Sequence, residues 1–415
     1  MRFYKLIWLI LAIPWGCGGL DILDAPERSL EVRRYEGTIY RTALTDDEIA
    51  NQGGILVYRF RSIPNMVYVK KQKKSDQLVP ILQIDETPDS QFGNENNFNV
   101  RESIVSPSIL PLQSQDVINL SPFEESGFLR GISKIKAGNL QFLPVKIAII
   151  DSGIVPSTPS IADALKKMTN LTHDFEQKKW QSHATAISSV YSGAYLNGKK
   201  INIYAPNAEL QGYKISFSGD DPTLLRRDLG MMQLAVALDN AVADGARVVN
   251  LSFSYQEEIP DEIARIEKLI MQRASGVVFL AAAGNSNEKI DNKNIYPAAY
   301  NLPNLVIVGN HDRHLAKAHS SNYGQSVDIS APGVNLPLNT ASGELSYFTG
   351  TSFSVPVVGS ALALYWGLKP QAGIKTVLKD LFETSTPKYS EVSLERFTRF
   401  GRLNTLDFLE RAIAQ

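Results

Sequence analysis

The chain has little cysteine, little histidine and almost no net charge, and each shortage excludes a class of function. Its single cysteine, Cys17, leaves no partner for an intrachain disulfide and no set of thiolates for a zinc site. Five histidines are too few for a histidine-rich metal centre. A formal net charge of -1 gives no general attraction to nucleic acid, so we expect no nucleic-acid partner. With 44% hydrophobic and 20% charged residues, the composition is that of an ordinary globular protein.

An apolar run near the N-terminus is too short to cross a membrane. Residues 6–15 read LIWLILAIPW after a basic start, whereas a bilayer span needs about 20 apolar residues. A run of this length followed by small residues is typical of an export signal. Cys17 stands close behind it, and residues 1–17 resemble a bacterial lipoprotein signal, which implies lipidation of Cys17 and a lipid anchor to the membrane. Pro14 and Trp15 depart from that pattern, so ordinary cleavage and secretion remain the alternative.

The first hundred residues contain short β-rich stretches and a polar segment. Residues 54–70 hold two β-rich stretches around a Ser-Ile-Pro turn, and 78–84 hold a third. Residues 88–99 are polar and have no apolar period, which predicts a linker. The lysines of 70–74 form a dense basic patch, but no aromatic side chains alternate with them. That pattern indicates a solvated loop and not a nucleic-acid site.

From residue 145 onward, apolar runs alternate with helical patterns. Continuous apolar runs predict buried strands, at 146–150, 247–253, 276–283 and 305–308. Mixed three- and four-residue spacing predicts a helix within 222–244. Residues 354–367 are apolar on nearly every face, so we expect a buried helix there. Strands of this kind separated by helices predict an α/β fold with a mostly parallel sheet and helices on both faces.

Four polar residues stand at the ends of these segments. In a parallel sheet, catalytic and ligand-binding groups lie at the carboxyl ends of the strands. Asp151 ends the first strand and Asn285 follows the third, while His183 opens a stretch of small residues. Ser352 precedes the buried helix. Each alone is typical of a turn, a cap or an ordinary core residue. Together they supply what acyl transfer needs, namely a nucleophile, a base, a carboxylate that orients the base and a donor for the oxyanion. We expect the other histidines at the surface or in loops, at His173, His311, His314 and His319.

The motifs around these residues resemble the subtilisin-like serine proteases, the subtilases. The resemblance runs from residue 144 to the C-terminus through nine segments in the family's order: KIAIIDSGI (146–154), HATAIS (183–188), APNAEL (205–210), VVNLSF (248–253), AAAGN (281–285), YPAAY (296–300), SSNYGQSVDISAPG (320–333), GTSFSVP (350–356) and FGRLN (400–404). The order Asp, His, Asn, Ser is also that of subtilisin. The resemblance implies a subtilisin-like three-layer fold and an exported serine endopeptidase acting on polypeptide substrates.

The resemblance also implies a role for each of these residues. Asp151 would orient His183, which would act as general base and then as general acid, and Ser352 would be the nucleophile. Asn285 and the Ser352 backbone N–H would form the oxyanion hole. A peptide substrate would pair with one strand, formed by Ser252, Phe253 and Ser254. The pocket for the residue before the scissile bond would be lined by Ala282, Ala283 and Gly284.

Departures from the family pattern leave one alternative open. Ala184 stands where the family has a glycine after the histidine, and Phe253 and Ser254 replace a leucine and a glycine. The alternative is a catalytically silent subtilase-fold binding protein of the cell envelope, although no catalytic residue is lost. The chemistry requires no cofactor. Many members bind structural calcium, but two lysines at 197–200 argue against a site in that loop, and any other metal site stays unknown.

The chain divides into three parts on this interpretation. Residues 1–17 would be the signal peptide and 18–105 a propeptide with a linker. Within the latter, 50–86 loosely resemble the small α/β propeptide that chaperones and inhibits many subtilases, so we expect a small α+β pro-region acting as an intramolecular inhibitor of a zymogen. Residues 106–415 would be the catalytic domain. The expected location is the bacterial cell envelope, through the lipid anchor, or the medium as a secreted protein.

Overall fold

The fold was determined as a computed structural model. It describes residues 37–41, 45–51, 54–64, 66–71, 79–80, 108–111, 126–138, 140–172, 181–201, 204–215, 230–255, 261–386 and 397–414. The predicted signal at 1–17 with Cys17, the predicted linker at 88–99 and His173 lie outside the described residues.

A parallel sheet of eight strands forms the centre of the molecule, in the order β17-β14-β13-β12-β11-β6-β10-β7. All seven neighbouring pairs run parallel. The strands are β6 (Val145–Asp151), β7 (Leu165–Asn170), β10 (Ala208–Lys214), β11 (Val248–Leu251), β12 (Val278–Ala282), β13 (Leu305–His311), β14 (Ile329–Pro332) and β17 (Gly401–Arg402). The predicted strands at 146–150, 247–253, 276–283 and 305–308 correspond to β6, β11, β12 and β13.

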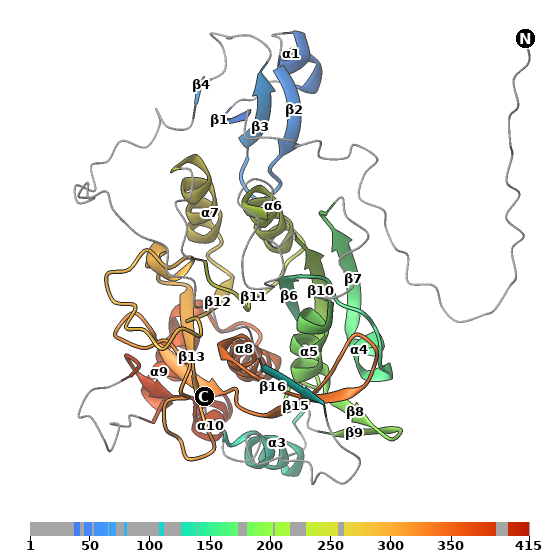
Figure 1. The fold of residues 1–415 in the computed structure, drawn as a ribbon, viewed down its shortest axis with the longest axis vertical. Helices are drawn as coiled ribbons and strands as arrows, with labels where there is room; N and C mark the ends of the chain where they lie inside the picture. The colour runs from blue at the N-terminus through green and yellow to red at the C-terminus, as the bar shows by residue number, and fades with distance from the viewer. Residues whose placement is uncertain are drawn as a thin grey trace, which may run out of the picture.

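Helices cover both faces of this sheet, as Figure 1 shows. Alternation along β6 separates the faces, because Ile147 and Ile149 belong to one hydrophobic cluster while Ala148 and Ile150 belong to another. The first cluster contains α5 (Gln181–Ser192) and α8 (Thr351–Leu368). The second contains α6 (Gly230–Ala243) and α7 (Asp261–Arg273). The three-layer α/β fold expected from the sequence is confirmed.

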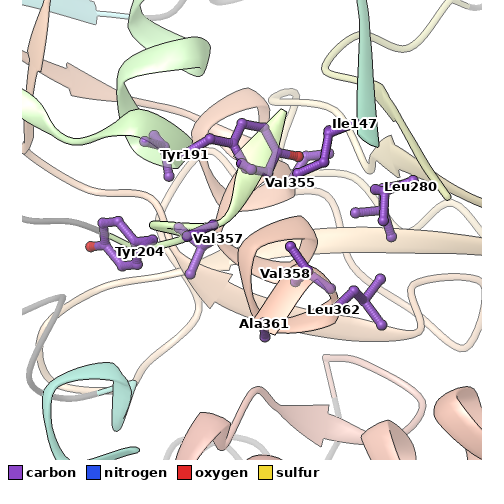
Figure 2. Packing of buried hydrophobic residues seen from close by; sticks show 14 of the residues in the cluster. Ile147, Tyr191, Tyr204, Leu280, Val355, Val357, Val358, Ala361 and Leu362 are labelled. Atoms are coloured by element: carbon purple, nitrogen blue, oxygen red, sulfur yellow. The ribbon is translucent and has the colours of Figure 1, made fainter. Parts of the chain in front are cut away.

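Helix α8 is the centre of the first cluster. It is long and apolar enough to cross a membrane, yet it is 94% buried inside the protein, as a core helix is. Figure 2 shows its residues Val355, Val358 and Leu362 packed with Tyr191 of α5 and with sheet residues. The remaining helices are α3 (Phe128–Ala137), α4 (Pro159–Ala164), the short 3-10 helix η3 (Ala298–Tyr300), α9 (Ile374–Thr384) and α10 (Thr405–Ile413).

A second, antiparallel sheet is formed by the N-terminal region. Its strands are ordered β2-β3-β1-β4 and accompanied by one short helix, with bounds β1 (Gly37–Arg41), α1 (Asp46–Asn51), β2 (Gly54–Arg59), β3 (Met66–Lys71) and β4 (Val79–Pro80). Figure 1 shows it in blue, next to α6 and α7. The small α+β region expected before the main domain is confirmed as a fold.

Two small sheets complete the described structure. Strand β5 (Ser108–Pro111) pairs with β16 (Leu345–Thr349), which also pairs with β15 (Leu336–Asn339). Strands β8 (Ala194–Leu196) and β9 (Lys199–Ile201) form a hairpin. Its turn residue Asn197 has a φ of 49°, and Lys199 and Lys200 are exposed.

The prediction for His311 was wrong. His314 and His319 are exposed as expected, but His311 is the last residue of β13 and only 2% exposed. Its Nδ1 lies 3.0 Å from Ser330 Oγ on the neighbouring strand, and burial lowers the pKa of His311 to about 3. Strand β13 extends three residues beyond the apolar run at 305–308, and pairing with β14 buries the extension.

Candidate active site

Asp151 and His183 form a buried pair at the carboxyl end of the sheet. Asp151 is the last residue of β6, and His183 lies in the first turn of α5. His183 Nδ1 lies 3.0 Å from Oδ1 and 3.1 Å from Oδ2 of Asp151. Oδ1 also accepts hydrogen bonds from the Ser152 backbone N–H at 2.6 Å and from the Ser152 hydroxyl at 2.9 Å. The carboxylate is therefore held from two sides.

The other ring nitrogen of His183, Nε2, differs from Nδ1 in its surroundings. Because a carboxylate only accepts, the Nδ1 atom facing Asp151 carries the hydrogen and Nε2 carries the lone pair of a neutral imidazole. Nε2 is buried and has no hydrogen-bond partner among the described residues. The ring of Phe353 lies beside the imidazole, with ring centroids 5.5 Å apart. Phe353 directly follows Ser352, so α8 begins next to His183.

Ser352 lies at the start of α8. The helix begins at Thr351, so the first backbone N–H groups, including that of Ser352, have no acceptor within the helix. Ser352 is buried, with 1% of its surface exposed. Its backbone carbonyl accepts a hydrogen bond from Ser252 Oγ at 2.7 Å. The start of the helix is thereby connected to the segment that follows β11.

The carboxamide of Asn285 is oriented by the same helix start. Asn285 Oδ1 accepts hydrogen bonds from the Thr351 backbone N–H at 2.9 Å and from the Thr351 hydroxyl at 3.1 Å. With Oδ1 occupied in this way, Nδ2 remains as a donor. A Cβ placed on Gly350 would lie 3.6 Å from Asn285 Nδ2, so the amide donor lies beside the loop that leads into Ser352.

The residues predicted to bind substrate lie in two adjacent segments. Ser254 Oγ would be 3.0 Å from a Cβ placed on Gly284, so the segment 252–254 and the segment 282–284 are in contact. Ser254 is half-buried, whereas Phe253 is buried and stacks on Tyr255 with ring centroids 6.5 Å apart. All three residues of the predicted pocket lining are buried: Ala282, Ala283 and Gly284.

Several contributors to this geometry were missed by the sequence reasoning. Thr351 orients Asn285, and Ser152 holds Asp151. Asn322 supports the loop around Asn285, since its Nδ2 donates to the Ala283 carbonyl at 2.8 Å and its Oδ1 accepts from two backbone N–H groups of the same loop. All three stand inside or next to the family motifs, which was the available signal.

A buried carboxylate of the main domain accepts several hydrogen bonds from the N-terminal sheet and the turn after β2. Asp239 of α6 is 0% exposed. Its Oδ2 accepts hydrogen bonds from Tyr58 Oη and from the Arg61 backbone N–H, both at 2.8 Å. Its Oδ1 accepts from the Ser62 backbone N–H at 2.7 Å and from the Ser62 hydroxyl. Apolar side chains of the same turn, Phe60 and Ile63, are buried in the cluster that contains α6.

No described part of the chain brings together three His, Cys, Asp or Glu side chains that could hold a metal ion. The loop at 197–200 is the exposed turn between β8 and β9. In that turn, Asn197 adopts a positive φ and two lysines follow.

Comparison with known proteins identifies the family. The Subtilase family model matches residues 144–401, more than half of the chain. The chain belongs to the subtilase family. Among curated subtilases, it is 26% identical over 262 residues to the thermophilic serine proteinase of Bacillus sp. strain AK1. The matched region covers 63% of this chain and 60% of that protein. It is 28% identical over 254 residues to subtilisin E of Bacillus subtilis strain 168, covering 58% of this chain and 61% of subtilisin E.

The solved structures show the same fold at low sequence identity. The epidermin leader peptide processing serine protease from Staphylococcus aureus superposes with a TM-score of 0.64 at 18% identity, covering 91% of this subtilase and 99% of that chain. The matches to the curated relatives are partial. This subtilase spans less than two thirds of the length of three of them, namely 60%, 26% and 66%.

Proposed function

We propose that this subtilase is a serine endopeptidase that hydrolyses peptide bonds through an acyl-enzyme. The observation that carries the proposal is the buried pair of Asp151 and His183, because the imidazole has an unpartnered Nε2 and its ring lies beside Phe353, the residue after Ser352. Membership of the subtilase family supports it.

Each group has a defined task in the proposed reaction. Ser352 Oγ attacks the carbonyl carbon of the scissile bond while its proton passes to His183 Nε2. Asp151 keeps the hydrogen on Nδ1 and stabilises the imidazolium that forms. When the tetrahedral intermediate collapses, the C–N bond breaks and His183 returns the proton to the leaving amine. A water molecule then attacks the acyl-enzyme by the same route and releases Ser352. No step requires a cofactor.

The oxyanion of the tetrahedral intermediate would be stabilised by Asn285 Nδ2 and the Ser352 backbone N–H. Asn285 is suited to this task, because Thr351 occupies its Oδ1 and leaves the amide as a donor before any substrate binds. A donor oriented in advance does not have to reorganise when charge develops.

Polypeptide substrates would pair with the segment Ser252, Phe253 and Ser254, and the side chain before the scissile bond would enter between it and 282–284. Contact between Ser254 and Gly284 supports a narrow entrance at this point. Ser254 is half-buried and would contact the substrate, whereas Phe253 is buried in the cluster that contains α6.

Within residues 18–105, the N-terminal sheet would act as an intramolecular inhibitor and folding template for the catalytic domain at 106–415. Its contacts with Asp239 support this role, since one donor from β2 and three from the turn after it converge on one buried carboxylate of α6. A parallel sheet of eight strands has many non-local contacts, which slow folding and give a template a physical purpose.

The protein would be exported. Residues 1–17 would be the signal, and lipidation of Cys17 would retain the enzyme at the bacterial cell envelope, while ordinary cleavage would release it into the medium. One relative, 27% identical over 258 residues, is a cell wall-associated protease of Bacillus subtilis strain 168. The N-terminal sequence and mass of the mature protein distinguish the two routes.

Labelling with a fluorophosphonate tests the catalytic proposal. After maturation, the wild type should react stoichiometrically at Ser352, and Ser352→Ala should take no label. Ser354→Ala is the matched control, because this neighbouring hydroxyl only donates to the Ala331 carbonyl at 3.0 Å, and it should label as the wild type does. A folded wild type without label would favour the silent binding protein, which the intact pair of Asp151 and His183 does not support.

A further inference from the structure

The backbone carbonyl of Ser352 lacks its regular helical donor. In an α-helix this carbonyl would accept from the backbone N–H four residues later, but that residue is Pro356, which has no N–H. The hydroxyl of Ser252, a residue that is 0% exposed, donates to the carbonyl at 2.7 Å. A side chain from outside the helix therefore helps to set the orientation of the Ser352 peptide group.

Two further buried side chains orient that hydroxyl. Asn250 Nδ2 donates to Ser252 Oγ at 2.8 Å, and the Tyr191 hydroxyl donates to Asn250 Oδ1 at 2.9 Å. All three side chains belong to fully buried residues. Every donor points the same way, from Tyr191 toward the Ser352 carbonyl, so the bonds polarise one another. We call this series, Tyr191–Asn250–Ser252, the buried relay.

Gly359 makes room for the first member of the buried relay. A Cβ placed on Gly359 would lie 2.2 Å from the Tyr191 hydroxyl oxygen and 3.0 Å from two ring carbons. Gly359 lies inside α8 with ordinary helical backbone angles, where glycine is among the least favourable residues. Space for the tyrosine, and not backbone conformation, therefore explains this glycine.

The buried relay connects the two helices that carry the proposed base and nucleophile. Tyr191 is on α5 with His183, Asn250 is on β11, and Ser352 is on α8. We propose that Tyr191 is a positioning residue for Ser352, holding its peptide group, and with it the nucleophile and the oxyanion N–H, in register with His183. The inference rests on the proposed protease function.

Tyr191→Phe in the full chain tests this role. Loss of the hydroxyl leaves Asn250 Oδ1 without its donor, so Asn250 can turn and its Nδ2 no longer holds Ser252 Oγ toward the Ser352 carbonyl. Because small displacements of a nucleophile cost much of its rate, we expect kcat on a peptide ester and the rate of fluorophosphonate labelling to fall about tenfold or more, with KM within about twofold of the wild type.

Tyr365→Phe is the matched control for stability. Tyr365 is a fully buried tyrosine of α8 itself, and its hydroxyl donates to Asp380 of α9 at 2.6 Å, without any bond to the buried relay. It should lower the melting temperature at least as much as Tyr191→Phe and keep the wild-type labelling rate. Gly359→Ala gives a second route to the same defect, and it should slow labelling more in the wild type than in the Tyr191→Phe background.

Labelling of Tyr191→Phe within twofold of the wild-type rate would overturn the inference, as would an equal loss of rate in Tyr365→Phe. If Tyr191→Phe does not fold, an undiminished rate in Gly359→Ala would overturn it as well. A wild type that takes no label refutes the proposed function and the inference together, whereas a labelled wild type with an unaffected Tyr191→Phe refutes the inference alone.

Discussion

A buried glutamate should make this protein less stable as the pH rises through neutrality. Glu267 of α7 is 0% exposed, and its Oε2 accepts hydrogen bonds from Tyr255 Oη at 2.8 Å and Tyr300 Oη at 2.6 Å. Its Oε1 has no hydrogen-bond partner among the described residues. Burial raises the pKa of Glu267 from 4.5 to about 7, against the opposing effect of the two tyrosine hydroxyls.

The size and sign of the effect follow from that change in pKa. Below pH 4.5 the carboxyl is protonated in both the folded and the unfolded chain, and its contribution to stability is complete. As the pH rises, the unfolded chain ionises first, so the free energy of unfolding falls until the folded pKa of about 7 is passed. The total loss is ~3 kcal/mol at about 1.4 kcal/mol per pKa unit.

Glu267→Gln removes this titration, and denaturant unfolding measures the difference. Between pH 5 and pH 8, in a Ser352→Ala background that prevents self-digestion, the parent should lose ~2–3 kcal/mol more than the variant. Glutamine leaves a buried amide donor without an acceptor, so the slope with pH decides the test and not the absolute stability. Glu383→Gln, whose side chain is 47% exposed on α9, should keep the parent slope. Equal slopes for Glu267→Gln and its parent would refute a raised pKa.

Three further changes test other parts of the structure. Asp239→Ala removes the acceptor of four hydrogen bonds from Tyr58, Arg61 and Ser62 and should weaken the attachment of the N-terminal sheet by ~2–5 kcal/mol; limited proteolysis of that sheet in the Ser352→Ala background should speed up, and unchanged protection would contradict it. Asn285→Ala should lower kcat by about 10²–10³ with little change in KM in steady-state assays, and a loss confined to KM would exclude an oxyanion role. Asn322→Ala removes three hydrogen bonds from the loop around Asn285; it should reduce the free energy of unfolding by ~2–3 kcal/mol, and a melting temperature equal to that of the parent would show that the loop needs no such support.

Sequence reasoning succeeded where the pattern is local. The apolar run KIAII predicted β6, and the all-apolar stretch at 354–367 predicted α8, because a segment without a polar face must be buried on all sides. The motifs around Asp151 and Ser352 likewise indicated the family, which the match over 144–401 confirmed.

The failures concern contacts between distant parts of the chain. His311 follows an apolar run, and only the pairing of β13 with β14 buries it. Nothing local to Asn285 shows that Thr351 will orient its amide, and nothing near Tyr191 indicates Gly359 as the residue that admits its hydroxyl.

By itself, the sequence therefore determined four of the eight strands of the central sheet, the buried helix α8 and the candidates for chemistry, because hydrophobic period and motif order are properties of neighbouring residues. The tertiary structure alone decided which hydrogen-bond partner each candidate has. Asp151 contacts His183, and Ser252 contacts the Ser352 carbonyl, only because the strands of the parallel sheet place their carboxyl ends at one edge of the sheet.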